Sequence, residues 1–133
     1  MDHSAQNHKW FRPPTQNQRR RARHRLARPV RAFAERFAAG VHHAIEAAHL
    51  PWHVSRLGCR AEYVFLPHAP RNGGQAAAAM DFELERFMHL YALNRGILLT
   101  PFHNMALMSP ATTSGDVDRH TQVFTAAVTE LTQ

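Results

Sequence analysis

The hydrophobic positions after residue 29 first follow a helical period. The stripe consists of Val30, Phe33, Phe37, Val41, Ala44, Ile45 and Ala48. Residues three or four positions apart share one face of an α-helix, so this pattern predicts an amphipathic helix. Pro51 cannot continue a helix, and we expect the helix to end before it.

Two shorter runs after Pro51 have the pattern of β-strands. They cover residues 53–57 and 60–66, with Gly58 and Cys59 between them. In the second run one face carries Ala61, Tyr63 and Phe65, and the other carries Arg60, Glu62 and Val64. Because side chains alternate between the two faces of a strand, we expect one face to be buried.

Helical spacing returns in the second half of the chain. Residues 75–94 are expected to form a helix whose inward positions are Met80, Leu84, Phe87, Met88 and Tyr91. Gly96 is placed to end this helix in a left-handed conformation. Short strands are expected at residues 97–99 and 105–109.

Thr113 and Asp116 have the spacing of a capping box, which predicts that the last helix begins there. Its expected apolar stripe is Val117, Phe124, Val128 and Leu131. The order of elements is therefore α-β-β-α-β-β-α. This order predicts an α+β fold, with a small, mostly antiparallel sheet covered by helices.

The positive charge of the chain lies at one end. Residues 1–28 contain eight cationic side chains and one acid, which gives +7, whereas residues 29–133 contain eight arginines and nine acids, which gives −1. Residues 1–28 also carry few large apolar side chains, so we expect a disordered basic tail followed by one folded domain, residues 29–133.

Composition excludes several classes of protein. Cys59 is the only cysteine, so the 133-residue chain cannot form an internal disulfide, and the cytoplasm is the expected compartment. No apolar run reaches the length of a membrane span. The chain has eleven histidines but no cysteine pair and no HExxH pattern, so a metal site is not predicted.

The region from residue 94 to residue 128 resembles the C-terminal end of the class III aminotransferases. The resemblance rests on the stretches Asn94-Arg95-Gly96, residues 97–101, residues 109–113 and Asp116-Val117-Asp118. Residues 50–65 resemble the family's entry into its small domain. In total the resemblance covers residues 30–133, and the branch around glutamate-1-semialdehyde aminomutase is the most similar.

This resemblance implies a homodimeric enzyme of fold type I that transfers an amino group on pyridoxal phosphate, through a Schiff base with a lysine. The only lysine of the chain is Lys9, in a context unlike that of the family. We therefore expect a C-terminal portion that is inactive alone and holds no cofactor by itself. A separately encoded large domain is a candidate partner.

The resemblance also suggests residues of the substrate pocket. Arg60 could hold a substrate carboxylate with its guanidinium fork, although a solvent-facing arginine is the plainer interpretation. The turn at residues 100–104 corresponds to a pocket-lining turn of the family, which places Thr100, His103 and Asn104 among the candidates. No catalytic, cofactor-binding or metal-binding residue is expected in this chain.

An alternative function is a non-enzymatic binding module that contacts nucleic acid through the basic tail. Eight cations could neutralise several phosphates in a salt-dependent way. Solvated disorder without a role is the favoured interpretation of the tail, and a transit peptide is a further one. Nucleic acid is therefore not the preferred partner, and no membrane is expected.

Overall fold

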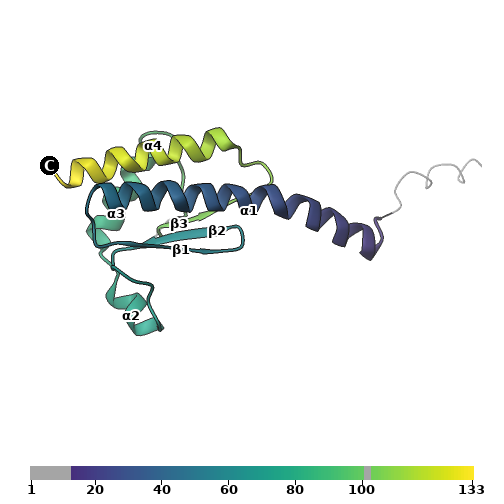
Figure 1. Cartoon of the computed structure of the whole chain (residues 1–133), viewed down its shortest axis with the longest axis horizontal. Helices are drawn as coiled ribbons and strands as arrows, with labels where there is room; N and C mark the ends of the chain where they lie inside the picture. The colour runs from purple at the N-terminus through teal and green to yellow at the C-terminus, as the bar shows by residue number, and fades with distance from the viewer. Residues whose placement is uncertain (1–12, 101–102) are drawn as a thin grey trace, which may run out of the picture.

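The computed structural model describes residues 13–100 and 103–133, and for residues 22–27 it describes the backbone only. The part of the chain that it describes contains four helices, one of them only six residues long, and three strands (Figure 1). The elements are α1 (Gln16–Ala47), β1 (His53–Leu57), β2 (Arg60–Val64), α2 (Gly73–Ala78), α3 (Phe82–Leu93), β3 (Met105–Leu107) and α4 (Ser114–Leu131). The predicted α+β class is confirmed.

The three strands form one antiparallel sheet with β2 in the centre. Tyr63 lies opposite Val54 of β1, and Ala61 lies opposite Ala106 of β3. The turn between β1 and β2 uses Gly58 at a φ of 62°, a conformation that glycine adopts without a steric penalty. The first two predicted strands are confirmed, although β2 ends at Val64.

Helices α1 and α4 run side by side in the same direction over the sheet (Figure 1). Ala61 and Tyr63 face these helices and are 0% and 2% exposed, so the predicted inward face of β2 is confirmed there. The ring centroid of Tyr63 lies 5.0 Å from that of Phe124 of α4, in an edge-on arrangement that aromatic pairs favour.

The two long helices approach each other closely at Gly40. A Cβ atom at this position would lie 2.5 Å from Oγ1 of Thr121, which is closer than van der Waals contact allows. One turn earlier, Arg36 holds Asp118 with two hydrogen bonds of 2.7 and 2.8 Å. The missing side chain at Gly40 thus offsets its cost in helix propensity, because it allows the helices to pack.

Helix α1 begins earlier than the hydrophobic pattern predicts. Thr15 caps it in a capping box with Gln18, and the helix continues through Pro29. The prediction of disorder is therefore wrong for residues 16–28, whereas residues 1–12 lie outside the described part of the chain. Arginine and glutamine are good helix formers, and Pro29 removes only one hydrogen bond from a long helix.

The helix predicted at residues 75–94 is divided into α2 and α3. Asp81 lies between them in an extended conformation, and its side chain accepts a hydrogen bond from the backbone N–H of Leu84. An N-cap at this point starts a new helix, so Met80 is 61% exposed rather than inward. Gly96 ends α3 at a φ of 78°, as predicted, and the N–H of Ile97 bonds to the carbonyl of Ala92.

The last part of the chain contains one strand rather than two. Residues 97–99 are not in a strand, and Leu98 is 74% exposed. β3 is also shorter than the predicted run. The predicted capping box of Thr113 and Asp116 is confirmed at the start of α4. Three positions of the α4 stripe are buried, whereas Leu131 at the end of the helix is 39% exposed.

Candidate functional site

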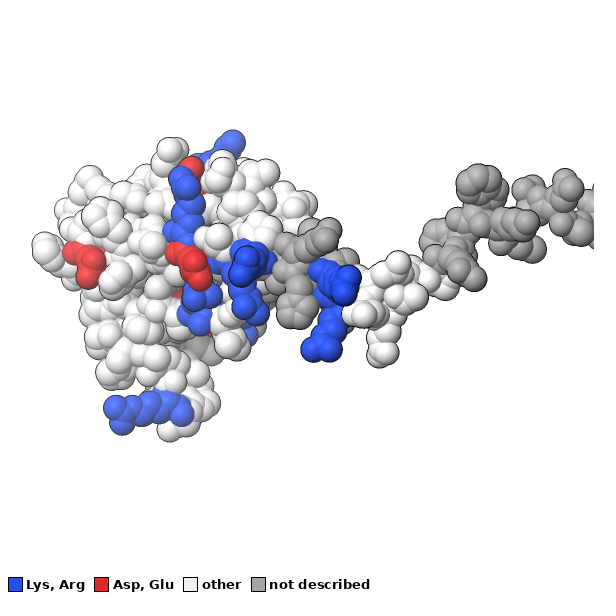
Figure 2. Space-filling model, turned by 45° about the vertical axis from the view of Figure 1, so that its right-hand side comes forward, with Lys and Arg blue, Asp and Glu red and all other residues white. Residues whose placement is uncertain are grey.

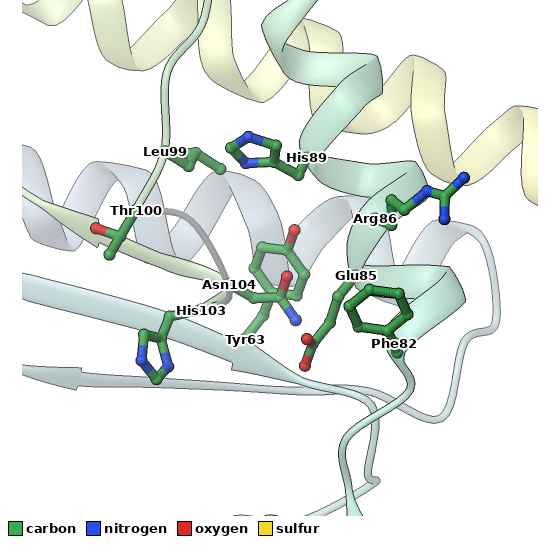
Figure 3. A pocket seen from close by; sticks show the side chains of 9 residues that line it. All are labelled: Tyr63, Phe82, Glu85, Arg86, His89, Leu99, Thr100, His103 and Asn104. Carbon is green, nitrogen blue, oxygen red and sulfur yellow. The ribbon is translucent and has the colours of Figure 1, made fainter.

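A pocket of about 110 Å³ lies between α3, β2 and the segment that leads to β3 (Figure 3). It contains three of the four candidates predicted from the sequence, Thr100, His103 and Asn104. Its other lining residues are Tyr63, Phe82, Glu85, Arg86, His89 and Leu99. The structure therefore brings a turn, a helix face and a strand together around one hollow.

Backbone hydrogen bonds hold the turn beside the sheet. The N–H of His103 donates to the carbonyl of Thr100 at 3.4 Å. The carbonyl of Asn104 accepts from the N–H of Tyr63 at 3.1 Å, which continues the pairing of β2 with β3. Asn104 is half-buried as a result, whereas His103 is exposed at the pocket rim.

Helix α3 contributes a carboxylate and an imidazole to the pocket. Glu85 and His89 are four residues apart, so they lie on the same face of the helix. In Figure 3 the Glu85 side chain points toward the strands beside the amide of Asn104, whereas the Arg86 guanidinium points away from the hollow. The acidic group is thus inside the pocket and the cationic group outside.

Burial and charge alter the acidity of two pocket groups. Desolvation raises the pKa of Tyr63 far above its ordinary value, and the nearby charge of Glu85 adds to this effect. Desolvation also raises the pKa of Glu85; the charge of Asp81 raises it further, and that of His103 lowers it. The phenol of Tyr63 therefore stays protonated and can donate a hydrogen bond.

Arg60 does not line this pocket. It stands at the opposite end of β2, where it forms an ion pair with Glu62, and its side chain is about half exposed. Residues an odd number of positions apart point to opposite faces of a strand, so Arg60 and Tyr63 cannot serve the same side of the sheet. The suggested role of Arg60 toward a substrate stays a prediction.

A second hollow of about 220 Å³ lies between residues 97–100, β3 and the start of α4. His120 lines it, although its side chain is buried and only 5% exposed. Its ring lies 4.2 Å from that of Phe37, and its Nδ1 atom has no hydrogen-bond partner among the described residues. Burial lowers the pKa of His120 to about 4, so the ring is neutral at pH 7.

Sequence reasoning did not single out Glu85, His89 or His120. His120 does fit the α4 stripe, because it lies three residues after Val117 and four before Phe124. Glu85 and His89 each follow an inward position, Leu84 and Met88, by one residue. That spacing places Glu85 and His89 at the border of the buried face of α3. This border lines a pocket only because the turn that follows α3 lies opposite it.

The described residues lack the group that would attach pyridoxal phosphate covalently. Schiff-base chemistry needs a primary amine, and no lysine occurs in residues 13–100 or 103–133. The same residues contain no group of three or more histidine, cysteine, aspartate or glutamate side chains that could hold a metal ion. They also include no helix that is long and apolar enough to cross a membrane.

The fold is shared with an aminomutase and an omega-transaminase of known structure, and the sequence is similar to that of the aminomutase. A glutamate-1-semialdehyde aminomutase from Pseudomonas aeruginosa PAO1 is 50% identical, with a TM-score of 0.77. A variant of it in complex with PMP is also 50% identical, with a TM-score of 0.78. In both comparisons the match covers 79% of this chain and 23% of the aminomutase.

An omega-transaminase from Sphaerobacter thermophilus has the same fold at 18% identity, with a TM-score of 0.69, over 83% of this chain and 25% of the transaminase. No family model and no curated protein matches the sequence. The predicted resemblance is confirmed: the chain corresponds to a C-terminal small domain of the class III aminotransferases, similar to the aminomutase branch. It spans about a quarter of the length of the solved relatives.

Proposed function

We propose that this chain serves as the C-terminal small domain of a pyridoxal-phosphate-dependent class III aminotransferase or aminomutase, and that it holds no cofactor alone. The observation that carries the proposal is the 50% identity to an aminomutase over 79% of this chain but 23% of the aminomutase. Such a match means that most of this chain is similar to one part of a larger enzyme.

The chemistry of the described residues supports a proposal in which this domain contacts the substrate and another part of the enzyme binds the cofactor. The pocket offers a carboxylate, two imidazoles, an amide and two hydroxyls, which can bind and orient a polar substrate. It offers no amine for a Schiff base. The lysine that carries the cofactor then belongs to another part of the enzyme.

Uncovered apolar surface supports the same proposal. Leu98 and Leu107 are 74% and 68% exposed, and both line the hollow that contains the unpartnered Nδ1 of His120. The run at residues 97–99 has the composition of a strand but lies outside the sheet. Exposed apolar patches mark surfaces that another segment covers. We assign this cover to the large domain, which the same enzyme or a separately encoded chain supplies.

The pocket turn gives the domain a role toward substrate. We propose that Thr100, His103 and Asn104 close one side of the active site once the large domain is in place. Arg60 stands apart from them, so a contact with a substrate carboxylate would require a different surface of the assembled enzyme. A homodimer of the intact enzyme remains part of this proposal.

Complementation tests the proposal. The probe is the P. aeruginosa aminomutase shortened by the segment that this chain matches, co-expressed with the full 133-residue chain. We expect the two pieces to co-purify and to regain cofactor absorbance and amino transfer. The pure chain mixed with pyridoxal phosphate should show no aldimine absorbance.

Matched variants locate the contact. Leu98→Asp and Leu107→Asp place a charge on the apolar surface and should abolish co-purification. Leu57→Asp is the control, because Leu57 is 80% exposed but lies on the far strand β1. A borohydride-stable adduct at Lys9 of the pure chain, together with transamination, would contradict the proposal.

A further inference from the structure

The first part of α1 is a basic helix that stands away from the domain. We call residues 16–31 the basic arm. Its first residues, 16–21, are all exposed, as are Arg28 and Arg31. Figure 1 shows this end of α1 running out beyond α4 and the sheet. The arm is therefore accessible at its described positions except Val30, which is 6% exposed.

The charge density of the arm is high and of one sign. Arginines occupy positions 19, 20, 21, 23, 25, 28 and 31, and no acidic residue occurs between Asp2 and Glu35. These seven charges span about 18 Å at a rise of about 1.5 Å per residue. Figure 2 shows blue arginine side chains on the described part of the arm, whereas the red acidic side chains in this view lie on the body of the domain.

Among the side chains that the structure describes, acidic groups of the domain do not neutralise this charge. None of the ion pairs formed among the described residues involves an arginine of the arm. Arg19 uses its Nε for the carbonyl of Pro14, at 3.0 Å. Arg28 and Arg31 are three residues apart in the helix and are therefore neighbours on its surface, where like charges repel each other. A polyanion that neutralises them would stabilise the arm.

Phosphate fits the arm better than a membrane does. The residues from 16 to 21 are Gln-Asn-Gln-Arg-Arg-Arg, and the arm has only two large aliphatic residues, Leu26 and the buried Val30, so it lacks an apolar face to insert into a bilayer. A guanidinium group binds phosphate oxygens through two parallel hydrogen bonds. Double-stranded DNA carries one phosphate charge per about 1.7 Å, a density that matches closely spaced arginines.

We propose that the basic arm binds the phosphate backbone of nucleic acid, without base specificity. The sequence alone favoured a disordered tail without a role. Residues 16–28 are instead helical, so the exposed arginines among them lie along one helix and can contact successive phosphates. The proposal does not depend on the aminotransferase function, and the arm contributes nothing to the pocket.

Fluorescence anisotropy with a labelled 20-base-pair DNA duplex and the full chain tests the proposal. With about five phosphate contacts, we expect the affinity to fall about 10²- to 10³-fold between 50 and 200 mM salt. A second duplex of unrelated sequence should bind equally well. The triple variant Arg19→Gln, Arg20→Gln, Arg21→Gln should reduce the slope of log affinity against log salt by about 2.7.

A matched control separates the arm from net charge. The control variant Arg56→Gln, Arg71→Gln, Arg86→Gln removes the same number of charges from the body of the domain. Glutamine has nearly the helix propensity of arginine, so the substitutions in the arm should leave its helix intact. We expect the control to bind DNA within threefold of the unchanged chain. Equal losses in both triple variants would overturn the proposal. So would salt-independent binding, or tighter binding to phosphatidylserine vesicles or to polyglutamate than to the duplex.

Discussion

Within helix α1, residues 16–29 and residues 30–47 depend on different sources of stability. The second segment buries Phe37, Val41 and Ala44 against α4 and the sheet. The first segment is exposed wherever its side chains are described, and it relies on the capping box of Thr15 and Gln18 and on helix propensity. One helix thus joins a packed segment to a self-supporting one. Hydrophobic periodicity detects only the packed segment, because periodicity reports on the face that is buried.

Truncation of the packed segment should have the largest effect. Phe37→Ala removes a ring that is 2% exposed and packs on His120, so we expect the free energy of unfolding to fall by about 3–5 kcal/mol. Arg20→Ala in the exposed segment should change it by less than about 0.5 kcal/mol. Urea titration followed by circular dichroism measures both. Similar losses in the two variants would show that the segments do not differ in packing.

Acidification should also weaken the packed segment, through His120. The folded ring has a pKa of about 4, below its ordinary value of 6.5, because burial penalises the charged form. Between these values the unfolded chain binds a proton that the folded chain does not. The free energy of unfolding should therefore decrease as the pH falls from about 6.5 to about 4, by about 3 kcal/mol in all.

His120→Leu removes this contribution to the pH dependence, which urea titrations at pH 7 and pH 5 can compare. The control is His42→Leu, because the side chain of His42 is 59% exposed. An unchanged pH dependence in the His120 variant would mean that another group titrates in this range.

The smallest effect should come from the cap of the exposed segment. Thr15→Ala removes the hydroxyl that accepts from the N–H of Gln18 at 3.3 Å, a loss of about 1 kcal/mol to the local helix. Because no packed side chain depends on this cap, the global unfolding midpoint should stay the same. Amide hydrogen exchange should accelerate at residues 19–22 alone. A shifted midpoint would indicate that the two segments unfold together.

Much of the fold could be predicted because its core positions follow clear periods. The stripe of α1, the inward face of β2 and the capping box of α4 all combine a local signal with burial. The break at Asp81 was not predicted, because aspartate fits a helix surface as well as an N-cap and the preceding alanines favour one long helix. Residues 97–99 have strand composition, but strand formation also requires a paired neighbour.

The candidate site was predicted in part, for a similar reason. Thr100, His103 and Asn104 lie within five residues, so one turn brings them together. Glu85 and His89 join them only through the way in which α3 packs beside the sheet, and no local pattern encodes that contact. Arg60 lies on the same strand as Tyr63, but the strand period directs the two side chains to opposite faces.

The continuity of α1 through Pro29 has a mechanical consequence. A helix of 32 residues is a rod about 48 Å long, and its far half is fixed to the domain by the close contact at Gly40 and Thr121. A molecule that binds the first turns of α1 would therefore also set the orientation of the pocket, because the helix and the domain rotate together.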